Sequence, residues 1–269
     1  MQHQVILILD FGSQYTQLIT RRLRELGVKT VIERGDLPGR DIRALEPIAV
    51  VLSGGPASVF EDGALQVDRE VFELGVPVLG ICYGLHLMAR DLGGRVRSSP
   101  HREYGFAELE VVEETPVFVG TPNRQPVWMS HGDLVESVPE GFGVLARTST
   151  TDVAAMFDPK RRFVGLQFHP EVRHTPHGDR MLEHFITLAG ARRDWSPSVI
   201  RHELVAKLGD RLTEGRVICG VSGGVDSSVT AMLLSEAIGN RLVPIFVDTG
   251  LLRKGEGDAV ERNFEEFGL

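Results

Sequence analysis

The sequence predicts an α/β fold, with an open, mostly parallel sheet that has helices on both faces, followed by a second, partial α/β unit. Three observations support this fold class. Short apolar runs alternate with helical patterns through the first half of the chain. Continuous apolar strands of this kind are typical of parallel sheets covered on both faces. Beyond residue 190, a strand–helix–strand pattern begins again.

The expected parallel strands are short and end at Gly, Pro or charged residues. They lie at 5–9, 29–33, 48–52 and 76–81, and helices with apolar residues at helical spacing lie at 15–26 and 85–92. From 105 to 166 the pattern changes to partial alternation, which predicts an antiparallel extension with strands at 107–112, 127–129, 144–147, 153–157 and 163–166. A further helix is expected over 179–188.

The predicted domain boundary is a polar, punctuated stretch at 191–197, between a first domain over 1–190 and a second over 198–269. The second domain is expected to contain a helix, a strand, a helix and a strand at 198–212, 216–221, 227–238 and 242–247. Two strands in about 70 residues make a marginal core. We therefore expect this domain to be truncated or to lean on the first.

Composition limits the class of protein. The chain has 42% hydrophobic and 25% charged residues and a net charge of −8, which argues against broad nucleic-acid or membrane-surface binding. Cys82 and Cys219 lie far apart, so a reducing compartment is expected rather than a disulfide framework. Residues 1–10 have no basic region before their apolar run, and no run is long enough to cross a bilayer. The expected location is the cytoplasm.

Cys82 follows the apolar run 76–81 and precedes a helical pattern, with Gly on both sides. A strand–turn–helix of this kind presents a nucleophile, and a helix N-terminus stabilises its thiolate form. His169 and Glu171 are a candidate base and its orienting carboxylate, because alternate residues of a strand point to one face. The alternative is a structural histidine beside a solvated carboxylate.

A second Gly-rich segment, Ser53-Gly54-Gly55-Pro56, follows the third expected strand. Successive glycines can aim backbone amides at a developing oxyanion, and the amide of Tyr83 would be the second donor. The alternative is a simple tight turn. Asp10, this segment and Cys82 each follow an expected strand. Parallel sheets of this kind place their sites at the carboxyl ends of the strands.

Together these motifs resemble the class I glutamine amidotransferases, which hydrolyse the side-chain amide of glutamine through a thioester. The resemblance implies that Cys82 is the nucleophile, His169 the base and Glu171 its orienter. It also implies that oxyanion and glutamine contacts come from Gly54, Gly55, Tyr83 and His86. Ser130, His131 and Asp133 would lie by the glutamine or at the face towards the second domain, and the alternative for them is a polar turn. The family usually has Gln where this chain has His86, which affects the expected glutamine contact.

A third Gly-rich segment lies between the strand 216–221 and the following helix, and its sequence is Ser222-Gly223-Gly224-Val225-Asp226-Ser227-Ser228. It lacks the Gly-Lys-Ser/Thr ending of a Walker A loop. It resembles the pyrophosphate-binding loop of ATP pyrophosphatases, rather than a generic turn. The resemblance implies ATP binding by residues 222–228 and by Asp248, with Asp226 near Mg²⁺. Cys219 is expected to lie in the core.

The chain has an amidotransferase-like domain followed by a pyrophosphatase-like loop. In this order, and together with residues 9–17 and 129–133, they resemble the glutamine-hydrolysing GMP synthase family. The resemblance implies a ligase of purine biosynthesis that uses glutamine and Mg²⁺-ATP to aminate XMP to GMP, with no tightly bound organic cofactor. In that family a C-terminal domain forms a homodimer, and we expect that domain to be absent from this chain. If Leu269 is the natural end, glutaminase activity without GMP synthesis is expected.

Other classes remain open. They are a glutaminase-only fragment, a different amidotransferase ligase such as an NAD synthetase, a stand-alone hydrolase, and a non-catalytic module of the same fold. Asp10-Phe11-Gly12 is also found in kinases, but no kinase lysine or catalytic loop accompanies it. Zinc is not expected at the additional histidines, which are His174, His177 and His184, because no cysteines lie among them.

Overall fold

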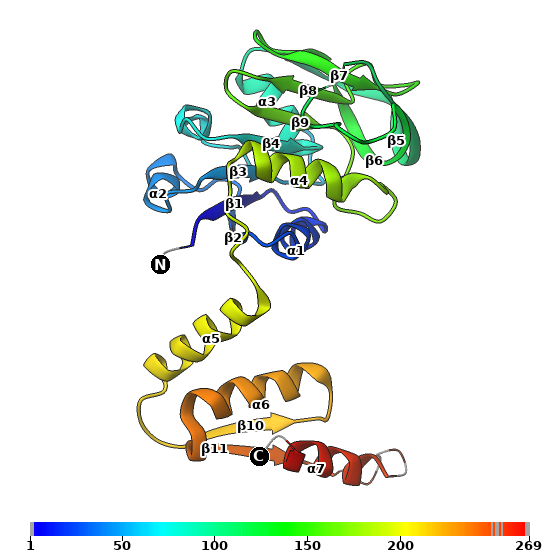
Figure 1. Cartoon of the computed structure of the whole chain (residues 1–269). Helices are drawn as coiled ribbons and strands as arrows, with labels where there is room; N and C mark the ends of the chain where they lie inside the picture. Colours follow the sequence, from blue (N-terminus) through cyan, green and yellow to red (C-terminus); the bar gives the residue numbers. More distant parts are fainter. Residues whose placement is uncertain (1–2, 114, 249, 251–252, 254, 267–269) are drawn as a thin grey trace. The chain divides into compact units, whose positions relative to one another are not determined.

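The computed structural model describes residues 3–113, 115–248, 250, 253 and 255–266 (Figure 1). The chain divides into two compact units between Trp195 and Ser196. This boundary lies inside the segment 191–197 that was predicted as a linker. Each unit is described by itself below. Residues 249, 251–252 and 267–269, on which parts of the predicted second domain fall, lie outside the described residues.

The first unit is built on one sheet with the strand order β2-β1-β3-β4-β9-β8-β7-β5-β6. Parallel pairing joins the five strands of one half, which are β2 (Lys29–Arg34), β1 (Val5–Asp10), β3 (Ala49–Leu52), β4 (Val78–Ile81) and β9 (Phe163–Leu166). Antiparallel pairing joins β9 to the other half, which consists of β8 (Ala155–Asp158), β7 (Gly143–Arg147), β5 (Arg95–Val111) and β6 (Arg124–Ser137).

Helices cover both faces of this sheet, as the sequence predicted. They are α1 (Thr16–Glu25), α2 (Gly39–Ala44), the 3₁₀ helix η1 (Arg69–Glu73), α3 (Tyr83–Asp91) and α4 (Gly178–Leu188). Alternate β1 residues enter separate cores, because side chains of a strand alternate between faces. Ile6 and Ile8 share a core with α1 and α4, and Leu7 and Leu9 share the other with α2, η1 and α3.

The hairpin of β5 and β6 is much longer than the sequence predicted. The expected strands covered only 107–112 and 127–129, whereas β5 and β6 contain 17 and 14 residues. The first part of β5 is polar and partly exposed, so it carries no apolar run. Its pairing with β6 is also interrupted, since residues 99–102 face only Gly132 in the register. The helices α2 and η1 were not predicted.

The second unit is a strand–helix–strand arrangement with flanking helices. Its elements are α5 (Pro197–Arg211), β10 (Val217–Val221), α6 (Val225–Ile238), η2 (Gly239–Arg241), β11 (Leu242–Phe246) and α7 (Glu256–Glu266), of which α7 was not predicted. Strands β10 and β11 pair in parallel. Cys219 is buried in a small core with residues of α6, β11 and α7, as predicted. No described helix combines the length and apolar composition of a membrane span.

Glycines let α3 approach the sheet closely. A Cβ on Gly84 would collide with the backbone carbonyl oxygen of Leu52, and one on Gly80 would lie 2.7 Å from the Gly84 carbonyl oxygen. The amide of Gly84 also donates a hydrogen bond to the carbonyl of Ser53, 3.1 Å away. The start of α3 is therefore held directly against β3 and β4 by backbone contacts.

Gly84→Ala is expected to destabilise the first unit by about 1–3 kcal/mol or more, because the clash is with backbone that cannot rotate away. Denaturant unfolding followed by tryptophan fluorescence measures this change, since Trp128 and Trp195 both lie in the first unit. Gly143→Ala is the matched control, because its Cβ would meet only the flexible Glu113 side chain. Equal midpoints for the two variants would contradict the role of Gly84.

Candidate active site

Cys82 occupies the sharp turn between β4 and α3. Its backbone has φ 50° and ψ −105°, a conformation that non-glycine residues rarely adopt. Its amide donates to the carbonyl of Leu166 on β9 at 2.8 Å, and its carbonyl accepts from the amide of His86. Strained backbone of this kind persists only where the surroundings impose it. The turn places the thiol at the N-terminus of α3, where the helix dipole stabilises negative charge.

His169 and Glu171 lie side by side, but not in a strand as predicted. Strand β9 ends at Leu166, and residues 169–171 belong to the turn that follows. The Nδ1 of His169 donates to Oε1 of Glu171 at 2.7 Å, and both side chains are buried. Two hydrogen bonds fix the turn. The His169 carbonyl accepts from the Thr175 hydroxyl, and the His169 amide donates to the backbone carbonyl of Trp128. The strand spacing was therefore the wrong reason for a correct contact.

The buried carboxylate favours the charged form of the imidazole. Burial by itself lowers the pKa of His169, but the charge of Glu171 and hydrogen bonds with Cys82 and Glu171 outweigh it, so the pKa is raised well above its ordinary value. Since Nδ1 is committed to Glu171, the other ring nitrogen faces the thiol. Within the described part of the chain, Oε2 of Glu171 has no hydrogen-bond partner. The imidazole and the carboxylate are thus bonded to each other, and Gly54 borders both His169 and Cys82.

Two loop amides next to this group are open. No backbone carbonyl of the described residues accepts from the amide of Gly55 or of Tyr83. A Cβ on Gly54 would lie 3.1 Å from Cε1 of His169 and 3.7 Å from Cβ of Cys82, so this loop contacts both reactive side chains. A Cβ on Gly55 would lie 3.3 Å from the Tyr83 ring. The predicted oxyanion amides therefore border the thiol and the imidazole.

The group opens into a cavity of about 600 Å³. The predicted residues on its wall are Gly55, Cys82, Tyr83, His86, Ser130, His131, Asp133 and His169. Arg102, Glu61 and Ser58 also line it and were not predicted from the sequence. The cavity thus has a nucleophile at one place and charged groups of both signs on its walls.

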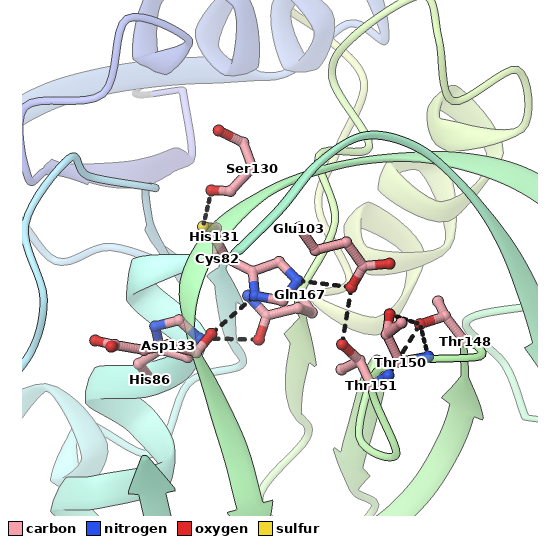
Figure 2. Close-up of polar contacts among 10 residues, drawn as sticks. All are labelled: Cys82, His86, Glu103, Ser130, His131, Asp133, Thr148, Thr150, Thr151 and Gln167. Atoms are coloured by element: carbon pink, nitrogen blue, oxygen red, sulfur yellow. Dashed lines mark hydrogen bonds and ion pairs between the residues drawn. The ribbon is translucent and has the colours of Figure 1, made fainter. Parts of the chain in front are cut away.

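Several of these wall residues are already hydrogen-bonded within the protein (Figure 2). The thiol of Cys82 donates to the carbonyl of Ser130 at 3.3 Å. Nε2 of His86 lies 2.9 Å from Oε1 of Gln167, and burial lowers the pKa of His86 to about 4. The carboxylate of Asp133 accepts from the hydroxyls of Ser58 and Ser98. Asp133 therefore ties the loop after β3 to the hairpin.

A family model described as glutamine amidotransferase class-I matches residues 7–189, which is more than half of the chain and contains the whole site. The chain belongs to the class I glutamine amidotransferases. This family is enzymatic, and glutamine is the substrate that it implies.

Curated relatives of this amidotransferase chain are named GMP synthase [glutamine-hydrolyzing]. One from Idiomarina loihiensis is 50% identical over 98% of this chain, and one from Geobacillus kaustophilus is 48% identical over 99%. The chain spans about half of their length, 52% in each case. These identities cover both units of the chain.

Solved structures with the same fold include proteins from two further organisms. A candidate GMP synthase subunit from Thermoplasma acidophilum is 30% identical with a TM-score of 0.65, over 71% of this chain and 96% of that one. A glutamine amidotransferase from Thermotoga maritima is 21% identical with a TM-score of 0.51, over 90% and 93%, and shows the fold alone.

The additional histidines of this amidotransferase make local contacts. His174 lies against Trp128 with ring centroids 4.4 Å apart, and Nε2 of His184 donates to the carbonyl of Val119. Among the described residues, no three His, Cys, Asp or Glu side chains gather where a metal ion would be held.

In the second unit, the predicted loop 222–228 runs from β10 into α6, with residues 222–226 exposed and Ser227 and Ser228 half-buried. The hydroxyl of Ser227 accepts from the amide of Ser222 at 3.1 Å and lies 3.1 Å from the carbonyl of Gly224. No side chain caps the first turn of α6, which has 14 residues. The loop is therefore closed by its own serines, with the helix amides uncovered. Asp248 accepts from the amide of Gly250.

Glu171→Gln is expected to lower the pKa of His169, because the carboxylate charge that favours the imidazolium is removed. Histidine ring signals followed by NMR during a pH titration measure the change. The matched control is Glu183→Gln, which removes an exposed carboxylate paired with Arg193. A His169 pKa that does not move in Glu171→Gln would show that the pair is not an electrostatic unit.

Proposed function

We propose that the first unit hydrolyses glutamine to glutamate and ammonia, and that the chain serves the glutamine-dependent conversion of XMP to GMP. One observation supports the hydrolysis above all others. Cys82 and His169 line the same cavity, and His169 is hydrogen-bonded to the buried Glu171, although Cys82 is far from the other two in sequence. A nucleophile, a base and an orienting carboxylate in that order are the parts of an acyl-transfer site.

The proposed reaction begins when the Cys82 thiolate attacks the side-chain carbonyl of glutamine. His169 holds the thiol proton as an imidazolium, which the charge of Glu171 stabilises. It then gives that proton to the departing nitrogen, because an amide nitrogen leaves poorly unless it is protonated. The amides of Gly55 and Tyr83 would stabilise the oxyanion, each by roughly 3 kcal/mol. Departure of ammonia leaves the glutamyl group on Cys82 as a thioester. The now neutral His169 then takes a proton from a water molecule that attacks the thioester, which releases glutamate and the Cys82 thiolate.

The walls of the cavity suit a zwitterionic substrate. Arg102 offers a cation for the α-carboxylate, and Glu61 offers an anion for the ammonium group. We place the glutamine between these groups and Cys82, with Ser130, His131 and Asp133 shaping the wall. His86 faces the same cavity as a neutral ring, in line with its low pKa. Its role as a glutamine contact remains a prediction.

For the second unit we propose that the loop 222–228 binds the phosphates of ATP. Its glycines permit close approach of the backbone, and the uncovered amides of α6 favour an anion. Asp226, in the first turn of α6, and Asp248 are carboxylates suited to Mg²⁺ held jointly with phosphate oxygens. Mg²⁺ would neutralise phosphate charge there. The residues present therefore fit a phosphate ligand with its metal ion.

The two halves of the proposed function are chemically linked. Free ammonia is mostly protonated at neutral pH and is then not a nucleophile, so making it inside the protein supplies the reactive neutral form to activated XMP. The names of the relatives support this assignment, although the chain spans 52% of their length. Amination of XMP, dimerisation and the identity of the two units as separate domains remain proposals.

Cys82→Ala is expected to reduce glutamate release by at least roughly 10⁴-fold, because no other side chain supplies the nucleophile. The measurement is glutamate production by the full chain, with and without Mg²⁺-ATP and XMP. Cys219→Ala is the matched control, since Cys219 lies in the core of the second unit. Glutamate release that survives in Cys82→Ala would reject the proposed hydrolysis and favour a binding module.

Ser227→Ala is expected to weaken Mg²⁺-ATP binding about tenfold or more, because it removes a hydroxyl that closes the loop next to the proposed phosphates. Titration calorimetry with Mg²⁺-ATP measures the dissociation constant. Ser235→Ala, on the same helix but away from its N-terminus, is the matched control. No binding by the unmodified chain would reject the nucleotide site without affecting the glutaminase proposal.

A further inference from the structure

A carboxylate that no motif drew attention to lies next to the cavity wall formed by β5 and β6, bonded to a residue of that wall. Glu103 lies directly opposite His131 in the register of the two strands. Directly opposed residues of an antiparallel pair point to the same face, so the two side chains meet. Oε2 of Glu103 lies 3.2 Å from Nε2 of His131, with 17% and 1% of the side chains exposed. The pair is therefore largely shielded from water.

The second ring nitrogen of His131 is also committed. Nδ1 lies 2.9 Å from the carbonyl oxygen of Asp133, an atom that can only accept. Both nitrogens thus face acceptor oxygens, one neutral and one a carboxylate, and the ring cannot rotate without losing a bond. The His131 ring therefore acts as a brace, meaning that it links Glu103 on β5 to the backbone of Asp133 on β6. It fixes residues 131–133, the segment of β6 that lines the cavity.

Glu103 connects a third element to this brace (Figure 2). The hydroxyl of Thr151 donates to the same Oε2 atom at 2.9 Å. Thr151 is buried in the turn between β7 and β8, which Thr148 closes by accepting from the Thr151 amide. Burial alone raises the pKa of Glu103, but hydrogen bonds from His131, Thr150 and Thr151 outweigh it and leave the pKa below its usual value.

The brace stands where the hairpin is weakest. On the far side of Glu103, residues 99–102 have only Gly132 opposite them, so the ladder gives little support to this part of the wall. Immediately before His131, the carbonyl of Ser130 accepts from the thiol of Cys82. A shift of His131 would therefore move the wall next to the nucleophile, while Cys82 is held by Leu166 on β9 and the turn of His169 is bonded to β6 at Trp128, three residues before His131.

We propose that Glu103 is a positioning residue for glutamine binding, which acts through His131 on the wall formed by residues 130–133. This inference rests on the proposed glutaminase function. Glu103 does not touch the reacting atoms, so it sets the fit of the substrate rather than the chemistry of the triad. Loss of its carboxylate leaves Nε2 of His131 and the Thr151 hydroxyl without their shared acceptor.

The test compares Glu103→Ala with Glu103→Gln in the full chain. Glu103→Ala is expected to raise KM for glutamine about tenfold, with kcat within threefold and the midpoints of the pH profile of kcat/KM unchanged. Glu103→Gln restores KM to within threefold of the unmodified chain, because its amide still offers an acceptor to Thr151 and a partner to His131. A residue of merely structural importance would lower the amount of folded enzyme without changing KM.

Glu110→Ala is the matched control, because Glu110 lies on the same strand, pairs with Arg147 at the surface and is outside the cavity lining. Its KM is expected to be unchanged. The proposal is overturned if Glu103→Ala keeps the original KM, if it lowers kcat alone, if Glu103→Gln is as impaired as Glu103→Ala, or if Glu103→Ala is unfolded by circular dichroism.

Calorimetry separates this inference from the proposed function. Glutamine is titrated into Cys82→Ala and into the double variant Cys82→Ala/Glu103→Ala, neither of which turns over substrate. A tenfold weaker dissociation constant in the double variant supports the positioning role, and equal constants overturn it. Absence of glutamate release by the unmodified chain would reject hydrolysis, and the binding comparison would still decide the role of Glu103.

Discussion

The site depends on the contact between the first turn of α3 and the backbone of β3 and β4. This contact exists because Gly80 and Gly84 have no side chains to hold the helix away. It forces Cys82 into a positive φ and brings the loop at 53–55 next to it. The thiol, the helix N-terminus and the open amides of Tyr83 and of the loop residue Gly55 then converge. A chain that relaxed this contact would lose the geometry of all three together.

The buried ion pair of His169 and Glu171 is the second feature on which the site depends. A buried charge is costly unless it is paired, and His169 and Glu171 are both almost fully buried. Each therefore requires the other, and the pair in turn favours a proton on the ring that faces the thiol. The same requirement for partners is met by Glu103 and His131, of which His131 lines the cavity. Cys82 thus shares its cavity with one histidine from each of two shielded His–Glu pairs.

Sequence patterns predicted four strands of the parallel half, β2, β1, β3 and β4, to within a few residues. The strand at 163–166 was expected in the antiparallel extension, and the structure corrects this, because β9 pairs in parallel with β4 on its other edge. Sequence patterns also predicted Cys82, His169 and Glu171 as a group, although the last two meet through a turn rather than a strand. The long hairpin was missed because Arg95–Val111 is polar at its start and exposes Tyr104 and Phe106. Glu103 was missed because its partner is set by strand register, and no local pattern carries that information.

The irregular segment at 99–102 has a consequence for how such a chain can change over time. Cross-strand partners close it at both ends, Ser98 with Asp133 on one side and Glu103 with His131 on the other. An insertion or deletion between these two clamps would be absorbed where it occurs, instead of slipping the whole ribbon by a residue and turning its inner face outward. The rim of the cavity can therefore be reshaped in evolution while the ladder beyond it keeps its alignment.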